Sequence, residues 1–282
     1  WRYFSIRALV TDGRSWLERE LASRGPVLMP YRVKALIGAG YLAEERRDLE
    51  VAHAWFEQAL HLAVAVGDRA SEGQALIGLG TVAHDRGEYE IALGHHQRAV
   101  DIARATGDRR ALAVGYANLG AVTYFQGRLE EALNHFSEGA DILLELGDVH
   151  AAAIGISNQA AIANEMGAFE RAVGFLRRSL DLQRRINSRR DLPPTLINLG
   201  ETTRELGQYA ASREAFTEAI TRARENDDMT MYALALHGLA VLQYVEKDIP
   251  ASAARRSSPQ SIISARRWGA ACTSGDRQRS WR

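Results

Sequence analysis

The sequence repeats itself every 40 residues, and the phase of the repeat does not drift along the chain. The first marker is a small residue, present at Gly40, Gly80, Gly120, Ala160, Gly200 and Ala240. A glycine follows seven residues later, at Gly87, Gly127, Gly167 and Gly207. Alanine or serine stands twelve residues after the first marker, at Ala52, Ala92, Ala132, Ala172, Ser212 and Ser252. A fixed period indicates a repeat architecture, in which each unit packs only against its neighbours. We therefore expect a stack of similar units with no single core.

Each unit is expected to form two antiparallel helices. In the third unit, Leu112–Gly147, apolar residues recur at helical spacing in two stretches that Gly127 separates. The apolar positions include Tyr116, Leu119, Val122, Leu129, Leu133, Phe136 and Leu143. The unit ends in Gly147-Asp148, where glycine suits a helix C-terminus and aspartate suits the N-cap of the next helix. Short turns thus connect a helix pair, and small residues such as Gly120 and Ala132 allow the two helices to approach closely.

Bulky side chains are expected to fill the space between units. Phenylalanine occupies one repeat position at Phe56, Phe136 and Phe216, and His96 stands there in the second unit. This places His96 in the core. Its neighbour His95 points about 100° away on a helix, and the pattern places no further ligand beside them. We therefore predict no metal site.

The repeats divide the chain into three parts. Five units are expected between about residues 31 and 228, followed by a sixth first helix at about 229–246. Residues 1–30 are predicted to form a degenerate N-terminal helix pair, and residues 31–250 the repeat solenoid. The basic, Ser/Arg-rich tail at residues 251–282 is expected to be disordered. The alternatives for this tail are a basic arm for nucleic acid or for an acidic partner, and a segment that is translated out of frame.

The distribution of charge and cysteine excludes several classes of protein. The chain has 35 basic and 35 acidic residues, but the tail holds seven of the arginines and one acid, which leaves an acidic body. An acidic body argues against a nucleic-acid surface on the solenoid. The single cysteine, Cys272, cannot form an internal disulfide. The most apolar run, Ala59–Val66, is too short to span a membrane.

The repeat pattern resembles a known family. The fullest copy is GLGTVAHDRGEYEIALGHHQRAV, Gly78–Val100, with small or aromatic residues at the spacing of the tetratricopeptide repeat. That repeat usually has about 34 residues, and a unit of 40 is similar to the long-helix variants in kinesin light chains and mitotic-spindle adaptors. The resemblance implies an all-α, right-handed superhelix (an α-solenoid) of antiparallel helix pairs. It also implies that the first helices line a concave, peptide-binding face.

The first residues carry a second resemblance. The segment Trp1–Ala22, with the sequence WRYFSIRA…DGRSWLERELA, looks like the opening of the tetratricopeptide region in bacterial signalling ATPases and LuxR-type transcriptional regulators. This implies a cytoplasmic regulatory or sensor module for signal transduction or transcription regulation. Because the first residue is Trp1 and not methionine, we expect the sequence to be a fragment of a larger protein or to start downstream of the true start site.

A row of asparagines is the main candidate binding feature. Asn118, Asn158 and Asn198 occupy the sixth position of three consecutive units. A carboxamide both donates and accepts hydrogen bonds, and in the long-repeat relatives this position resembles a clamp for a peptide backbone. On the same predicted face lie Tyr124, Phe125, Asn164, Glu165, Glu201, Arg204 and Glu205, with Glu44, Glu45, His84 and Asp85 nearer the N-terminus. The alternatives are that the asparagines space the helices, that the aromatic residues pack internally, and that the acids form a solvated face.

These features together favour a non-catalytic scaffold that binds a protein or peptide. No phosphate-binding, metalloprotease or nucleophile-elbow motif occurs in the sequence, so we predict no enzyme activity, no cofactor and no metal. One alternative is a structural module that self-associates through the unfinished C-terminal unit. The other is a sensor that closes its groove on a small molecule.

Overall fold

A computed structural model describes residues 29–248 together with Gly13 and Leu17. The predicted tail at 251–282, and nearly all of the predicted helix pair at 1–30, lie outside these residues. Within the described part, the regular elements are α-helices, and no strand occurs there. None of the described helices is both long and apolar enough to cross a membrane.

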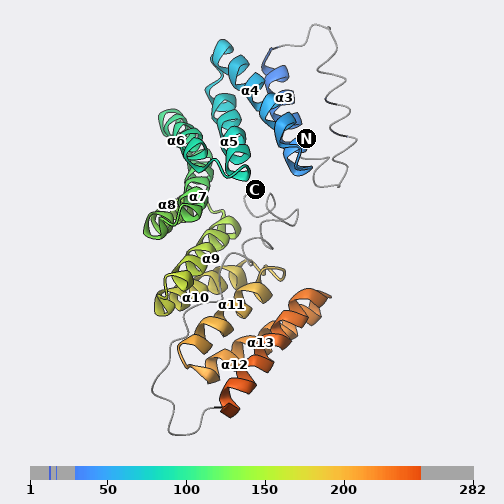
Figure 1. Ribbon diagram of the computed structural model, residues 1–282, viewed down its shortest axis with the longest axis vertical. Helices are drawn as coiled ribbons and strands as arrows, with labels where there is room; N and C mark the ends of the chain where they lie inside the picture. Colours follow the sequence, from blue (N-terminus) through green and yellow to red (C-terminus); the bar gives the residue numbers. More distant parts are fainter. Residues whose placement is uncertain (1–12, 14–16, 18–28, 249–282) are drawn as a thin grey trace. The chain divides into compact units, whose positions relative to one another are not determined.

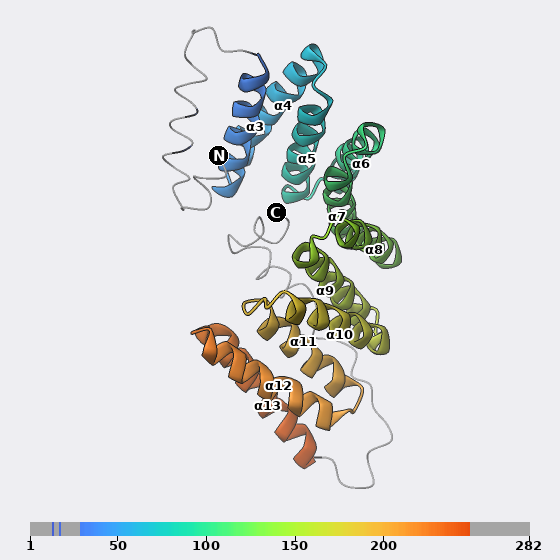
Figure 2. The same ribbon diagram turned by 180° about the vertical axis from the view of Figure 1, so that it is seen from behind.

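The chain divides into two compact units, Trp1–Ile142 and Leu143–Arg282, here called the N-terminal and C-terminal units. The N-terminal unit holds α3 (Met29–Glu45), α4 (Leu49–Val66), α5 (Arg69–Asp85), α6 (Tyr89–Thr106), α7 (Arg109–Phe125) and most of α8 (Leu129–Glu145). The C-terminal unit holds α9 (Val149–Glu165), α10 (Phe169–Arg185), α11 (Leu192–Glu205), α12 (Tyr209–Glu225) and α13 (Met229–Asp248). Within each unit, consecutive helices pack side by side (Figures 1 and 2). The predicted all-α architecture of helix pairs is confirmed.

Glycine makes the tight turn inside four of the five helix pairs that the structure describes. The turn residue has a positive φ, between 71° and 79°, at Gly87, Gly127, Gly167 and Gly207. A side chain is strained in this left-handed conformation, which explains the glycine row in the sequence. The first pair uses Arg47, with φ of 63°, at the equivalent position.

The connection between pairs combines a left-handed residue with an aspartate cap. Gly67, Gly107 and Gly147 have φ between 71° and 74°, and Asn187 and Asp227 adopt φ of 53° and 54° in the later repeats. The next residue is Asp68, Asp108, Asp148 or Asp228, and its carboxylate accepts a hydrogen bond from a backbone N–H three residues later. These caps satisfy N–H groups that have no partner inside the helix, as the sequence predicted.

The first marker row is small because a ring lies directly on it. A Cβ added to Gly40 would lie 2.7 Å from the Phe56 ring, and one on Gly120 would lie 2.9 Å from Phe136. In the second repeat, a Cβ on Gly80 would lie 2.4 Å from the imidazole of His96. The ring of the second helix thus sits against the backbone of its own first helix.

The same rings also contact the following repeat. A Cβ on Gly78 would lie 2.4 Å from Phe56, and one on Gly238 would lie 2.3 Å from Phe216. Both phenylalanines are fully buried. The expectation that these rings fill the space between repeats is therefore confirmed, and each ring is held between two helix backbones.

Candidate functional site

The three asparagines lie on first helices and are half-buried. Asn118 is on α7 in the N-terminal unit, and Asn158 and Asn198 are on α9 and α11 in the C-terminal unit. Among the described residues, none of the three carboxamides hydrogen-bonds with another group of the chain. Each amide therefore keeps its donors and its acceptor for solvent or a ligand.

The position that holds asparagine also has a packing role. Gly78 and Gly238 occupy it in the second and sixth repeats, where the ring of the preceding second helix fills the space that a Cβ would need. At Asn118 and Asn198 the ring position of the preceding second helix holds the smaller His96 and Leu176. Asparagine is not always accompanied by a smaller residue at the ring position, because Phe136 occupies the ring position before Asn158. The close ring contact is therefore seen where this position holds glycine, at Gly78 and Gly238.

The two candidate aromatic residues of α7 lie in different environments. Tyr124 is buried, with 8% of its surface exposed, so its ring presents little area to a ligand. Phe125 is 42% exposed. Its ring packs edge-on against His84, with centroids 4.8 Å apart, and stacks on Tyr89 at 5.9 Å. Phe125, His84 and Tyr89 thus form an aromatic cluster with Phe125 at its exposed side.

Sequence reasoning placed His84 on this face but missed Tyr89. A signal was present, because Tyr89 opens a second helix at a position that is apolar or aromatic in the other repeats. The equivalent residues are Leu49, Leu129, Phe169 and Tyr209.

Asp85 is engaged inside the N-terminal unit. Its carboxylate pairs with the guanidinium of Arg47, which belongs to the preceding repeat, and its side chain is only 4% exposed. Glu44 and Glu45 are half-buried at the end of α3. The acidic face predicted here therefore includes at least one carboxylate that ties two repeats together and is not presented to a partner.

Three candidates of the C-terminal unit make internal contacts. Asn164 Nδ2 donates a hydrogen bond to Thr202 Oγ1 at 2.8 Å, and the Thr202 hydroxyl donates to the backbone carbonyl of Asn198 at 2.7 Å. The Asn164–Thr202 hydrogen bond joins α9 to α11 and uses one donor of the Asn164 amide. Arg204 and Glu205 pair at 2.8 Å. Glu165 is exposed and Glu201 is half-buried on the same two helices.

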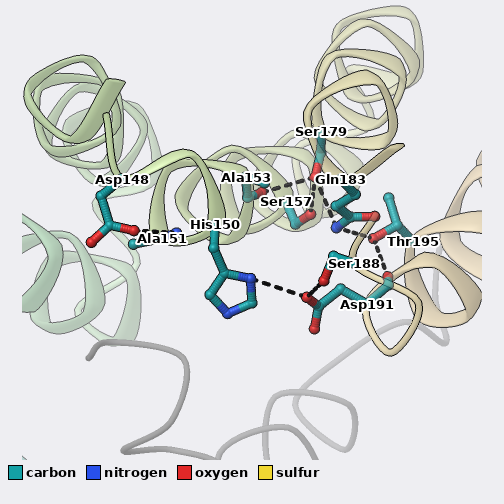
Figure 3. Close-up of polar contacts among 10 residues, drawn as sticks. All are labelled: Asp148, His150, Ala151, Ala153, Ser157, Ser179, Gln183, Ser188, Asp191 and Thr195. Atoms are coloured by element: carbon teal, nitrogen blue, oxygen red, sulfur yellow. Dashed lines mark hydrogen bonds and ion pairs between the residues drawn. The ribbon is translucent and has the colours of Figure 1, made fainter. Parts of the chain in front are cut away.

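A buried polar cluster in the fourth repeat was missed by sequence reasoning (Figure 3). Ser179 Oγ donates to the carbonyl of Ala153 at 2.9 Å and therefore accepts from Ser157 Oγ at 2.8 Å. Gln183 Nε2 donates to Ser179 Oγ at 3.2 Å and to Thr195 Oγ1 at 2.9 Å. These contacts join α9, α10 and α11.

The cluster leaves one acceptor without a partner. Gln183 is buried, both hydrogens of its amide nitrogen are used, and its Oε1 has no hydrogen-bond partner in the described part of the chain. Alignment of the repeats would have revealed the cluster. The residues equivalent to Ser179 are Ala59, Ala99, Gly139 and Ala219, and those equivalent to Gln183 are Ala63, Ala103, Leu143 and Ala223.

A serine, an aspartate and a histidine also meet beside this cluster (Figure 3). Ser188 Oγ donates a hydrogen bond to Asp191 Oδ2. His150 Nδ1 also lies 3.2 Å from Asp191 Oδ2. In a nucleophilic triad the imidazole hydrogen-bonds with the serine hydroxyl and removes its proton. Here both groups contact the carboxylate, so the imidazole is not placed to activate the hydroxyl. The arrangement links the start of α9 to the turn before α11.

His96 is buried in the core position that the sequence assigned to it. Its burial lowers its pKa to about 3, with the nearby His84 and His95 adding to the shift. The imidazole is therefore neutral near pH 7. Among the described residues, no group of three or more His, Cys, Asp or Glu side chains could hold a metal ion.

Several solved structures are similar to this chain in fold. BtubC (BKLC) from P. vanneervenii is 17% identical, with a TM-score of 0.60 over 92% of this chain and 97% of its own. A signal transduction ATPase with a tetratricopeptide repeat sensor from Pyrococcus horikoshii is 15% identical, with a TM-score of 0.74. That match covers 86% of this chain but 37% of the ATPase. A Rap protein complexed with Competence and Sporulation Factor is 17% identical, with a TM-score of 0.56 over 77% of this chain and 65% of its own.

Sequence comparison gives the family directly. No curated protein sequence matches the chain. A family model described as tetratricopeptide repeat matches residues 71–145 and 151–225. Because these two stretches make up more than half of the 282 residues, the chain belongs to the tetratricopeptide repeat family.

Proposed function

We propose that this protein is a non-catalytic scaffold that binds an extended peptide or a helix of a partner protein on its first helices. The observation that carries the proposal is the row of three half-buried carboxamides with no partner inside the described chain. A peptide backbone offers one donor and one acceptor per residue, which a carboxamide matches. The similar Rap protein, solved with Competence and Sporulation Factor, supports this type of role.

Each unit has its own set of contacts. In the N-terminal unit, Asn118 would hold backbone while the exposed side of Phe125 would receive an apolar or aromatic side chain. Aromatic anchors commonly supply much of the binding free energy at interfaces. In the C-terminal unit, Asn158 and Asn198 would hold backbone, and Glu165 and Glu201 would favour a basic segment. The set excludes the buried Tyr124 and the internally bonded Asn164.

We also propose that the chain acts as the regulatory or sensor part of a larger cytoplasmic signalling or transcription-regulating protein. The similarity to the ATPase with a tetratricopeptide repeat sensor supports this context. The resemblance of Trp1–Ala22 to the start of such regions supports it as well. A module of this kind needs no catalytic group or cofactor, because its partner or an attached domain supplies the output.

The test compares partner capture by three forms of the full chain. These are the unmodified protein, the triple variant Asn118→Ala/Asn158→Ala/Asn198→Ala, and the control Asn134→Ala, which removes an exposed asparagine from a second helix. Proteins captured from a source-cell lysate are identified by mass spectrometry, and the affinity of each candidate is then measured by calorimetry. Circular dichroism checks that all three forms are folded.

The clamp predicts a large effect confined to the triple variant. Three lost hydrogen bonds of about 0.5–1.5 kcal/mol each should weaken binding by at least about tenfold. The control should bind like the unmodified protein. Equal affinity of the triple variant would show that the asparagines only space the helices.

A further inference from the structure

The last described helix, α13, has one packed face and one open face. On the packed side, Ala235 and Leu242 are fully buried, and Gly238 lies against the ring of Phe216. On the opposite side, four residues at helical spacing are exposed, and we call them the outer face of α13. They are Ala233, Leu236, Ala240 and Gln243.

With one exception, the same positions are buried in the earlier first helices. Residues equivalent to Leu236 are between 0% and 2% exposed at Leu36, Leu76, Ile156 and Leu196, whereas Leu236 is 41% exposed. The exception is Tyr116 in the third repeat, which is half-buried. The positions equivalent to Ala240 are all buried, at Gly40, Gly80, Gly120, Ala160 and Gly200. In each earlier repeat a second helix packs against the first, and in the third repeat Phe136 and Gly139 of α8 lie against α7. The outer face is thus an inter-helix surface that has no covering helix among the described residues.

The sequence after α13 lacks the pattern of a second helix. In the first repeat, that pattern places Ala52, Phe56, Ala59 and Ala63 against the first helix. The equivalent positions after α13 are Ser252, Arg256, Pro259 and Ile263. An arginine replaces the ring, and a proline falls where a helix interior needs an N–H donor.

We propose that the outer face of α13 binds the same face of a second copy of this chain. The two helices are antiparallel, and the two-fold axis crosses them at the level of Gly238 along the helix. Leu236 and Ala240 are equally spaced from Gly238, so Leu236 of one copy meets Ala240 of the other, twice. Ala233 and Gln243 are paired in the same way. A large side chain against a small one allows helices to pack closely, and a two-fold axis is the commonest symmetry of protein dimers.

The charge of the segment is compatible with this occupant. Between Met229 and Val245 the sequence contains no Asp, Glu, Lys or Arg. Two such faces can meet without burying an unpaired charge, which would oppose association. In the antiparallel arrangement, a second copy of the chain therefore meets an uncharged face on which large and small side chains lie opposite each other.

The first experiment measures the mass of the full chain by sedimentation velocity over a range of concentrations. A monomer–dimer equilibrium is expected, and Leu236→Glu should raise its dissociation constant at least about tenfold. The matched control is Leu234→Glu. Leu234 is 43% exposed, but its equivalents are exposed or half-buried in every repeat, at Lys34, Gln74, Val114, Ile154 and Pro194. This control should dimerise normally.

A second set of variants tests the antiparallel arrangement itself. Leu236→Ala and Ala240→Leu should each weaken the dimer, the first by removing contact area and the second by placing leucine against leucine. The double variant should recover the dimer, because it restores one large and one small residue at each contact. A full chain that stays monomeric at all concentrations would overturn the proposal. Equal weakening by both glutamate variants, or a double variant weaker than either single one, would also overturn it.

Discussion

Two second helices of the same repeat pattern, α4 and α10, are held in place by different chemistry. In α4, the fully buried Phe56 ring lies between the backbones of Gly40 and Gly78, and the positions toward the helix end are alanine. In α10, leucine replaces the ring, and Ser179 and Gln183 replace the alanines with a hydrogen-bonded cluster. Both are the second helix of their repeat. The comparison shows that the repeat specifies a backbone arrangement that either apolar or polar packing can stabilise.

The two kinds of packing should respond differently to mutation. An apolar contact is non-directional and loses stability in proportion to the area and volume removed. A buried polar cluster loses stability when one member is removed, because the remaining partner is left unsatisfied. The predictions below test this difference, from the largest expected effect to the smallest.

Phe56→Ala should give the largest loss. Removal of a fully buried ring leaves a cavity between two helices, and such changes lower the free energy of unfolding by about 3–5 kcal/mol. Urea denaturation followed by circular dichroism measures this loss. The surface change Phe125→Ala, at the exposed side of the aromatic cluster, is the control and should have a much smaller effect. A loss below that of the control would mean that the ring contributes no packing.

Acid should destabilise the protein through His96, which occupies the ring position of the second repeat. Its pKa falls from 6.5 to about 3 on folding, because burial disfavours the charged form. The contribution of neutral His96 to the free energy of unfolding is fully present above pH 6.5 and is lost as the pH falls toward 3. The loss for this one group is about 1.4 kcal/mol per pH unit.

The matched variant for this prediction is His96→Phe. It installs the residue that the first, third and fifth repeats carry at this position. As the pH falls from 6.5 to 4, the unfolding free energy of the unmodified protein should decrease relative to that of the variant. A constant difference over that range would contradict a buried, neutral His96.

Gly78→Ala should lower the free energy of unfolding by about 1–3 kcal/mol, because the added Cβ would overlap the Phe56 ring. The control is Gly94→Ala on α6, where nothing lies within 4 Å of an added Cβ. That change should stabilise the helix by about 0.5–1 kcal/mol. The double variant Gly78→Ala/Phe56→Leu should lose less than the sum of its single changes. Strict additivity would show that the two residues do not compete for space.

Ser179→Ala should lower the free energy of unfolding by about 1–3 kcal/mol, because the hydroxyl of Ser157 and the amide of Gln183 lose their shared acceptor. The double variant Ser179→Ala/Gln183→Leu replaces both members with residues found in other repeats, and it should be closer to the unmodified protein. Thermal denaturation of both variants checks the order. A double variant that is less stable than Ser179→Ala would show that the cluster acts through packing volume alone.

The candidate site was less predictable from sequence than the fold. The pattern placed Tyr124 and Phe125 on one face, yet Tyr124 is buried and Phe125 is exposed. Adjacent helix residues point about 100° apart, and the neighbouring helices decide which of them faces solvent. Likewise, the sequence placed Asn164 beside the row of unpartnered amides, but Thr202, 38 residues later, uses its amide.

What the sequence alone determined about this protein is local. Gly127 marks a left-handed turn because a side chain is strained there, and Asp148 caps a helix because its carboxylate reaches an N–H three residues away. Repetition of such local rules every 40 residues was enough to predict the helix pairs. Only the tertiary structure decided which polar groups are used internally, as in the pairs Arg47–Asp85 and Asn164–Thr202. Those contacts depend on distances between helices of different repeats, and no periodicity along the chain specifies such distances.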